Sequence, residues 1–304
     1  MGEIKPEKNT GLMKWWKMMR PHTLSASFVP VALGTALVLP LKTPNVTLFA
    51  AMMIASMLIQ IATNLFNEYF DFKRGLDNQD SIGIGGSIVR DGFHPKTILR
   101  LAFALCFAAM LIGVYICAIS SWWIALAGLI CILTGYLYSG GPYPIAYTPF
   151  GELVSGLFMG VFIIWISFYI QTETLSLNCI LISIPIGLLV GGINMANNIR
   201  DLTGDKEKGR RTLPILLGRP KSIILLAGIF AFSYVWIIAL MLFGVESAWL
   251  LIVFASLPKA IQATKLFRNK TKAIQLMPAM KATAQLQTLF GILLSLGLVL
   301  DYFI

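Results

Sequence analysis

Two short polar segments at the ends of long apolar runs carry most of the side chains that could do chemistry. The second segment places Asn197, Asp201 and Asp205 four residues apart. Steps of four residues advance an α-helix by about 400°, so the three side chains form one stripe about 12 Å long. Hard oxygen ligands without His or Cys suit Mg²⁺, which keeps several waters and bridges to substrate phosphates. The spacing therefore predicts a divalent-metal site that binds a phosphorylated substrate.

The first polar segment repeats this pattern. Asn67 and Asp71 have the same spacing of four residues. Asn64 and Glu68 form a second such pair on the neighbouring row of the same helix, and Asp77 follows after a helix-breaking glycine. Two such stripes facing each other would hold a diphosphate between metal ions. The predicted metal ligands are Asn64, Asn67, Glu68, Asp71, Asp77, Asn197, Asp201 and Asp205.

Basic residues are interleaved with both stripes, as expected where phosphate oxygens carry the negative charge. The alternative is that these bases only anchor the protein to anionic lipid headgroups. Two segments with matching spacing favour diphosphate binding over that alternative. The candidates in the two segments are Lys73, Arg74, Arg90, Lys206, Arg210 and Arg211.

Tyr138 lies in a Tyr- and Gly/Pro-rich stretch that closes the fourth apolar run. Tyrosine at this position is typical of the aromatic belt at a membrane interface. Its other use is a π-face beside a developing allylic cation. With Asp71, Asp201 and Arg211, it completes the set of residues that we predict to be catalytic.

The elements that position these residues cross a membrane. Of 304 residues, 57% are hydrophobic and only 12% are charged, and the mean hydropathy is +0.77. Soluble domains are about a quarter charged, so this composition excludes a solvated globule. The net charge of +10 reflects cytoplasmic loop bias in a membrane protein, and nucleic-acid binding is excluded as a first interpretation.

A bilayer core takes about 20 apolar residues of helix. The chain has nine such runs, so we predict an all-α polytopic protein whose residues 1–304 form a single transmembrane domain. If the nine runs thread from a cytoplasmic N-terminus, 23 of the 24 Lys and Arg residues fall on the cytoplasmic side, as the positive-inside rule requires. This topology predicts a cytoplasmic N-terminal segment at 1–20, cytoplasmic cap loops at 71–96 and 201–221, and a C-terminus outside. The predicted spans are 24–41, 46–70, 97–119, 122–138, 150–170, 177–200, 222–243, 246–266 and 283–304.

A cation transporter is the competing class of function, because acids in membrane helices also mark ion pathways. In a transporter the acids should lie near the bilayer midplane, beside unwound helices. Here they lie at the cytoplasmic ends of the predicted spans, which favours an enzyme.

Over nearly its whole length, the chain resembles the UbiA superfamily of intramembrane aromatic prenyltransferases. The paired acidic motifs are specific to that superfamily, and the Gly-Ile-Gly-Gly stretch with the long Asp71-to-Asp77 spacing is similar to its naphthoate branch. The segments that carry the resemblance are Arg20–Leu24, Asn64–Asp77, Gly83–Arg90, Tyr138–Glu152, Asn197–Asp205 and Gly209–Leu213.

The resemblance implies a nine-helix bundle with a cavity that opens laterally to lipid, in the plasma membrane. It implies Mg²⁺ bound to a polyprenyl diphosphate, with the diphosphate held by neighbouring bases that include Arg20. It further implies prenylation of 1,4-dihydroxy-2-naphthoate with loss of CO₂, which gives demethylmenaquinone in menaquinone biosynthesis. Glu68 stands where Asp is common in the superfamily, so the choice between Glu68 and Asp77 as metal ligand is open. Acceptor choice depends on cavity shape, so 4-hydroxybenzoate, haem and a chlorophyllide remain alternatives.

Overall fold

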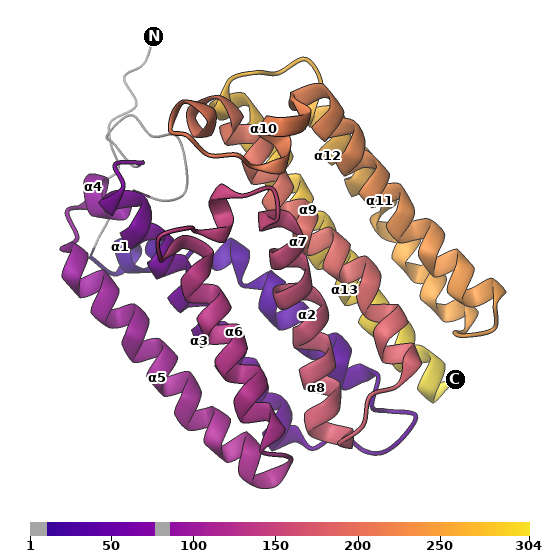
Figure 1. Cartoon of the computed structure of the whole chain (residues 1–304). Coiled ribbons are helices and arrows are strands. Elements are labelled where there is room, and N and C mark those ends of the chain that lie inside the picture. Colours follow the sequence, from indigo (N-terminus) through magenta and orange to yellow (C-terminus); the bar gives the residue numbers. More distant parts are fainter. Residues whose placement is uncertain (1–10, 77–85) are drawn as a thin grey trace.

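The computed structural model describes residues 11–76 and 86–304, and within them it is a bundle of helices without a strand (Figure 1). The predicted all-α class is confirmed. Asp77 and the Gly83–Gly85 stretch, both named from the sequence, lie outside the described residues.

Seven helical stretches are long and apolar enough to cross a membrane, so the protein is a multi-pass membrane protein. Two further apolar helices, α2 (Ser25–Ala36) and α6 (Trp123–Ser139), have 12 and 17 residues. The count of nine spans therefore stays a prediction. The seven are α3 (Val46–Lys73), α5 (Pro95–Ile119), the run of α7 (Gly151–Ser155), η3 (Gly156–Phe162) and α8 (Ile163–Thr172), α9 (Leu177–Glu207), α11 (Arg219–Leu242), the run of η4 (Ala248–Ser256) and α12 (Leu257–Phe267), and α13 (Ala273–Phe303).

The two predicted cap loops are partly helical. Helix α3 continues to Lys73 and α9 to Glu207, beyond the apolar residues from which their spans were predicted. Short helices α4 (Ser87–Asp91) and α10 (Leu213–Leu217) occupy other parts of the two segments. Hydropathy marks only the part of a helix that lies in lipid, so it cannot show where the helix itself ends. The acidic stripes consequently sit on rigid helix.

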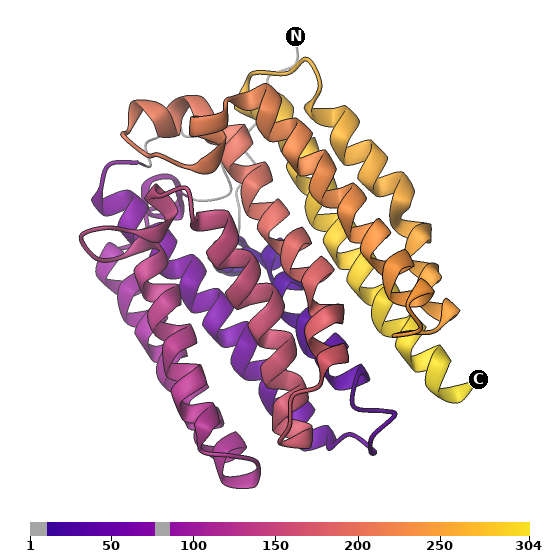
Figure 2. The same cartoon turned by 45° about the vertical axis from the view of Figure 1, so that its right-hand side comes forward.

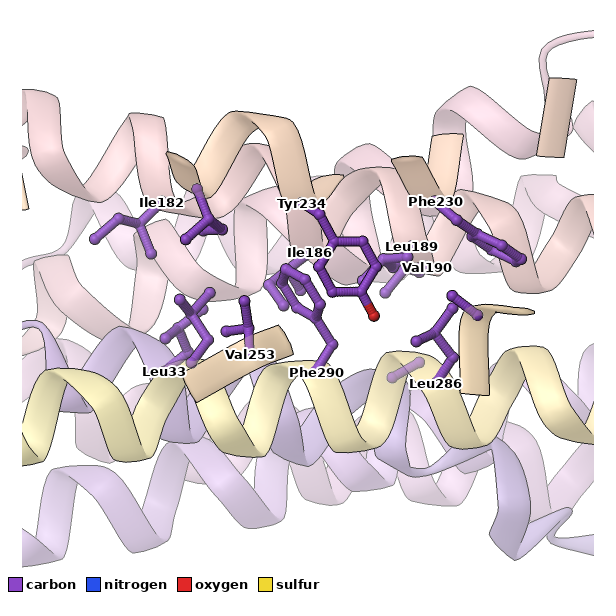
Figure 3. Close-up of a cluster of buried hydrophobic side chains, with 14 of the residues drawn as sticks. Leu33, Ile182, Ile186, Leu189, Val190, Phe230, Tyr234, Val253, Leu286 and Phe290 are labelled. Carbon is purple, nitrogen blue, oxygen red and sulfur yellow. The ribbon is translucent and has the colours of Figure 1, made fainter. Parts of the chain in front are cut away.

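Helix α9 packs in the middle of the bundle. Buried side chains from α9, α11 and α13 interdigitate, among them Ile186, Tyr234 and Phe290 (Figure 3). On another side, a Cβ atom at Gly160 of η3 would come within 2.5 Å of the Gly187 Cα. Such glycine contacts let membrane helices approach closely, and this one fixes α9 against η3.

The ends of α3 and α9 lie at the same end of the bundle as α4 and α10, and we call this the polar end (Figures 1 and 2). The turn between α5 and α6 lies at the opposite end, as does the C-terminus. Short helices α1 (Gly11–Met18), η1 (Pro21–Thr23) and η2 (Ile145–Tyr147) complete the described elements.

Candidate active site

The two acidic segments meet at Arg210, which follows α9. Its Nη2 donates to Asp71 Oδ1 at the end of α3, at 2.9 Å, and its Nη1 lies 3.4 Å from Asp205 Oδ1 on α9. Asp71 and Arg210 are 139 residues apart in sequence. The convergence of the two stripes, which the sequence suggested only by their matching spacing, is thus present in the structure.

The Arg210 guanidinium is held in a charged and aromatic setting. Burial by itself would lower the pKa of Arg210, but the Asp71 and Asp205 carboxylates raise it, and the net pKa is above the usual arginine range. The guanidinium carbon lies 4.9 Å from the centre of the Tyr147 ring, a favourable cation–π distance. Arg210 is therefore a fixed positive charge between two carboxylates.

Asp205 has a carboxylate oxygen that is open to a further ligand. Its Oδ2 is buried and has no hydrogen-bond partner, a costly state for a polar atom. A cation would satisfy this oxygen. No group of three His, Cys, Asp or Glu side chains converges within residues 11–76 and 86–304. A divalent ion here would therefore need amide, water or phosphate oxygens as well, which is how Mg²⁺ is usually bound.

Asp201 faces a different base. Arg200 donates to both of its carboxylate oxygens, from Nε at 2.8 Å and from Nη2 at 2.5 Å. The other Arg200 nitrogen, Nη1, lies 2.7 Å from the Met280 sulfur. Asp201 is thus held by its neighbour, with its side chain one third exposed.

A cavity of about 500 Å³ extends from the polar end into the bundle. Arg20, Asn64, Asn67 and Asn197 line its polar part, and most of the remaining lining is apolar. The two asparagines that lead the acidic stripes, Asn67 and Asn197, thus face one common space. A charged group bound at the stripes would sit at the mouth of a chamber suited to an apolar chain.

A model of the UbiA prenyltransferase family matches residues 27–283. The chain belongs to this family. It is 54% identical over 302 residues to the 1,4-dihydroxy-2-naphthoate octaprenyltransferase of Bacillus subtilis, covering 99% of this chain and 97% of that protein. It is 27% identical over 270 residues to the protein of the same name from Mycobacterium tuberculosis, covering 89% and 91%. A UbiA homologue from Archaeoglobus fulgidus, solved with DMAPP and Mg²⁺, has the same fold, with a TM-score of 0.65, 14% identity, and 93% and 99% coverage.

Within this UbiA-type site, Tyr138 is positioned by a residue that the sequence analysis missed. Asn194 on α9 donates from Nδ2 to the Tyr138 hydroxyl oxygen at 2.7 Å, and both side chains line the cavity. Because the tyrosine oxygen accepts this bond, its own proton is left to donate elsewhere. Asn194 lies three residues before Asn197, and this helical spacing is a signal that could have revealed it.

Apart from Arg20 and Arg210, which pair with carboxylates, the predicted diphosphate ligands divide into two groups. Arg74 contacts the backbone carbonyls of Ser139 and Gly141 and the rings of Phe70 and Tyr147. It therefore holds the loop after α6 in place. Lys73, Arg90, Lys206 and Arg211 are exposed near the acidic segments.

Three more contacts at the polar end were not foreseen. Ser139 donates its hydroxyl hydrogen to Asn67 Oδ1, and the Lys208 ammonium group contacts the Leu76 carbonyl. The Arg211 backbone N–H donates to the Tyr147 carbonyl at 2.9 Å. These contacts join the segment after α9 to the end of α3 and to the loop after α6. Backbone groups as well as side chains therefore hold the parts of the site together.

Two further predicted metal ligands, Glu68 and Asn64, hold neighbouring elements in place. Glu68 is 1% exposed, and its Oε2 accepts from Arg20 at 3.2 Å and from the Gly86 N–H at 3.0 Å, while Oε1 accepts from the Ile88 N–H at 3.2 Å. Asn64 donates from Nδ2 to the Met19 carbonyl. These contacts hold η1 and α4 against α3, so the geometry favours a positioning role for this pair.

We therefore expect Glu68→Ala to act mainly on stability. The substitution leaves the Arg20 charge and two backbone N–H groups without their acceptor, so the unfolding temperature of the purified protein should fall. In the folded fraction, the Mg²⁺ concentration that gives half-maximal turnover should stay within about twofold of wild type, since loss of a metal ligand, or of a group that hydrogen-bonds to one, shifts it by about tenfold or more. Thermal unfolding and a Mg²⁺ titration measure the two quantities, and a large shift in the Mg²⁺ concentration would mean that Glu68 belongs to the metal site.

Proposed function

We propose that this protein transfers a polyprenyl chain from a polyprenyl diphosphate to 1,4-dihydroxy-2-naphthoate. Diphosphate and CO₂ leave, and the product is demethylmenaquinol, the reduced form of demethylmenaquinone, so the reaction belongs to menaquinone biosynthesis. The observation that carries the proposal is the convergence of Asp71, Asp205 and Arg210 at the mouth of an apolar cavity. The name of the Bacillus subtilis relative, at 54% identity over nearly both chains, supports the naphthoate as acceptor.

The residues present fit a divalent cation, and we propose Mg²⁺. Asp71, Asp205 and Asp201 would supply carboxylate oxygens, and Asn67 and Asn197 amide oxygens, which are the donors that Mg²⁺ prefers. The partnerless Asp205 Oδ2 is the most direct support. When bound, Mg²⁺ neutralises the charge that develops on the leaving diphosphate.

The bases of the site would orient the diphosphate. Arg210 already lies between the two acidic stripes, and its planar fork suits phosphate oxygens. Arg20 lines the cavity mouth while bound to Glu68, so its position is fixed before substrate arrives. A preorganised positive charge stabilises a leaving group without reorganisation during the reaction.

The cavity would protect the carbocation that forms when the C–O bond ionises. Its lining is mostly apolar, so little water competes with the aromatic ring for the cation. The Tyr138 ring also lines the cavity near the polar end and can stabilise the allylic charge through its π-face. The electron-rich naphthoate ring then attacks the allylic carbon.

The function is tested in nanodiscs with Mg²⁺, octaprenyl diphosphate and either 1,4-dihydroxy-2-naphthoate or 4-hydroxybenzoate, with lipid-soluble product measured by mass. We expect prenylated product only with the naphthoate, lighter by one CO₂ than the simple adduct, and none after EDTA. Product only with 4-hydroxybenzoate would keep the site and change the acceptor. Absence of product with both would overturn the proposal.

We also propose that the protein lies in the plasma membrane with the polar end in the cytoplasm. The distribution of bases supports this orientation, since only Lys42 falls on the opposite side of the nine-span topology. The N-terminus would then be cytoplasmic and the C-terminus outside.

This orientation predicts opposite labelling of two exposed lysine positions. In intact cells, Lys42→Cys should react with a membrane-impermeant maleimide, because it lies outside. Lys221→Cys at the start of α11 should react only after permeabilisation. The wild-type protein is the control, because Cys106, Cys117 and Cys179 are buried and Cys131 is partly buried. The reverse labelling pattern would invert the topology.

A further inference from the structure

Three helix glycines line the cavity, and only one of them, Gly135, has a packing reason. At Gly135 in α6, a Cβ atom would come within 2.7 Å of Thr63 Oγ1, so close approach of α6 to α3 requires glycine. At Gly113 in α5 and Gly128 in α6, a Cβ atom would meet nothing within 4 Å. Glycine destabilises a helix interior relative to alanine, and packing does not explain its presence at these two positions.

Gly113 and Gly128 lie at one level of the cavity wall. Both line the cavity. Gly113 is six residues before the end of α5 at Ile119, and Gly128 is five residues after the start of α6 at Trp123. At 1.5 Å a residue, both lie about 8–9 Å from the turn that joins these antiparallel helices, which run side by side in both views (Figures 1 and 2).

This level is near the deep end of the cavity, whose lining continues to Trp122 at the start of α6. The lining residues of α3 extend from Asn67 at the polar end to Met52, a distance of about 22 Å along the helix. Met52 shares a buried cluster with Ile116, one turn from Gly113. A prenyl chain whose diphosphate sits at the acidic stripes would therefore reach the two glycines only with its distal isoprene units.

The wall at this level also borders the outside of the bundle. Met110, Val114 and Leu129 line the cavity and are nevertheless 43%, 54% and 57% exposed. Gly113 and Gly128 add no side chain to this exposed part of the wall and thus leave space there. A long apolar tail needs such space to extend past the end of the chamber.

We propose that Gly113 and Gly128 determine the prenyl tail length that the enzyme accepts, by keeping the deep end of the cavity open for the distal isoprene units. This inference rests on the proposed prenyl transfer and names the residues that select its donor. A larger side chain at either position would obstruct a long tail and leave a short one unaffected, because a short tail ends before this level.

The test compares turnover of octaprenyl and geranyl diphosphate by the same preparation of Gly113→Leu or Gly128→Leu protein. We expect the ratio of octaprenyl to geranyl turnover to fall about tenfold or more, with geranyl turnover within about threefold of wild type. The ratio cancels any loss of folded protein. Gly113→Ala and Gly128→Ala provide smaller obstructions and should shift the ratio in the same direction by less.

Gly228→Leu is the matched control. Gly228 is an exposed helix glycine of α11 with no atom within 4 Å of an added Cβ, and it does not line the cavity. Its ratio should equal that of wild type. If the ratio of octaprenyl to geranyl turnover is unchanged in both Gly113→Leu and Gly128→Leu protein, the inference is wrong and the proposed function still stands. If the leucine variants do not fold, the two alanine variants decide the question in the same way. If wild type turns over neither diphosphate, the proposed function fails and the inference fails with it.

Discussion

Replacement of Asp71 by Asn should lower turnover by about 10²–10³-fold, the loss typical of removing one group that stabilises transition-state charge. Asp71 supplies the α3 carboxylate opposite Asp205, and both face Arg210. The amide keeps the shape of the side chain and removes its charge, so the site loses affinity for a divalent cation and the 2.9 Å partner of Arg210 becomes a neutral acceptor. The rate of prenyl transfer in nanodiscs at saturating Mg²⁺ measures the effect.

Folding should survive this substitution, because Asp205 remains as a partner for Arg210. Thermal unfolding of the purified variant checks this point. Asp301→Asn is the matched control, since Asp301 is an exposed aspartate near the C-terminus at the opposite end of the bundle. Its turnover should equal that of wild type. If the Asp71→Asn protein is folded and its activity is within about threefold of wild type, Asp71 is not a catalytic residue and the electrostatic role assigned to it is wrong.

The sequence predicted the site best where residue type and spacing were both restrictive. Two stripes of Asn and Asp with the same spacing suggested one binding site, and the structure brings Asp71 and Asp205 to the same guanidinium. The resemblance in these motifs also led to the UbiA family, to which the chain belongs. Apolar length located the helices, although it could not show that α9 continues to Glu207.

The individual roles were harder to predict, because one residue type serves several purposes. Glu68 has the same spacing from Asn64 as Asp71 has from Asn67, yet Glu68 accepts hydrogen bonds from Arg20 and from the start of α4. Arg74 is a base beside an acidic stripe and nevertheless contacts backbone carbonyls after α6. Which way a helix ridge faces depends on tertiary packing, and a spacing rule contains no information about it. The roles of these residues in binding metal and diphosphate accordingly stay predictions.

Arg210→Gln should have a second large effect, with kcat/KM for the prenyl diphosphate lowered about 10²–10³-fold. The variant removes the charge that forms ion pairs with both acidic stripes. Arg210→Lys keeps the charge and loses the planar fork, so its activity should lie between those of the glutamine variant and wild type. Arg268→Gln, an exposed base that follows α12, is the control and should leave kcat/KM unchanged.

Arg210→Gln should also change the stability of the protein, which is measured without turnover. Without Arg210, the carboxylates of Asp71 and Asp205 have lost the cation that lies between them, and removal of one partner from a buried ion pair destabilises the fold. The unfolding temperature of Arg210→Gln protein without divalent ions should therefore be lower than that of wild type. Mg²⁺ binds only the folded site, so it should raise that temperature more in the variant than in wild type, where Arg210 competes for the same oxygens. An equal Mg²⁺ effect in the two proteins would mean that the metal and Arg210 do not share these carboxylates, and the metal ligands would then have to be sought elsewhere.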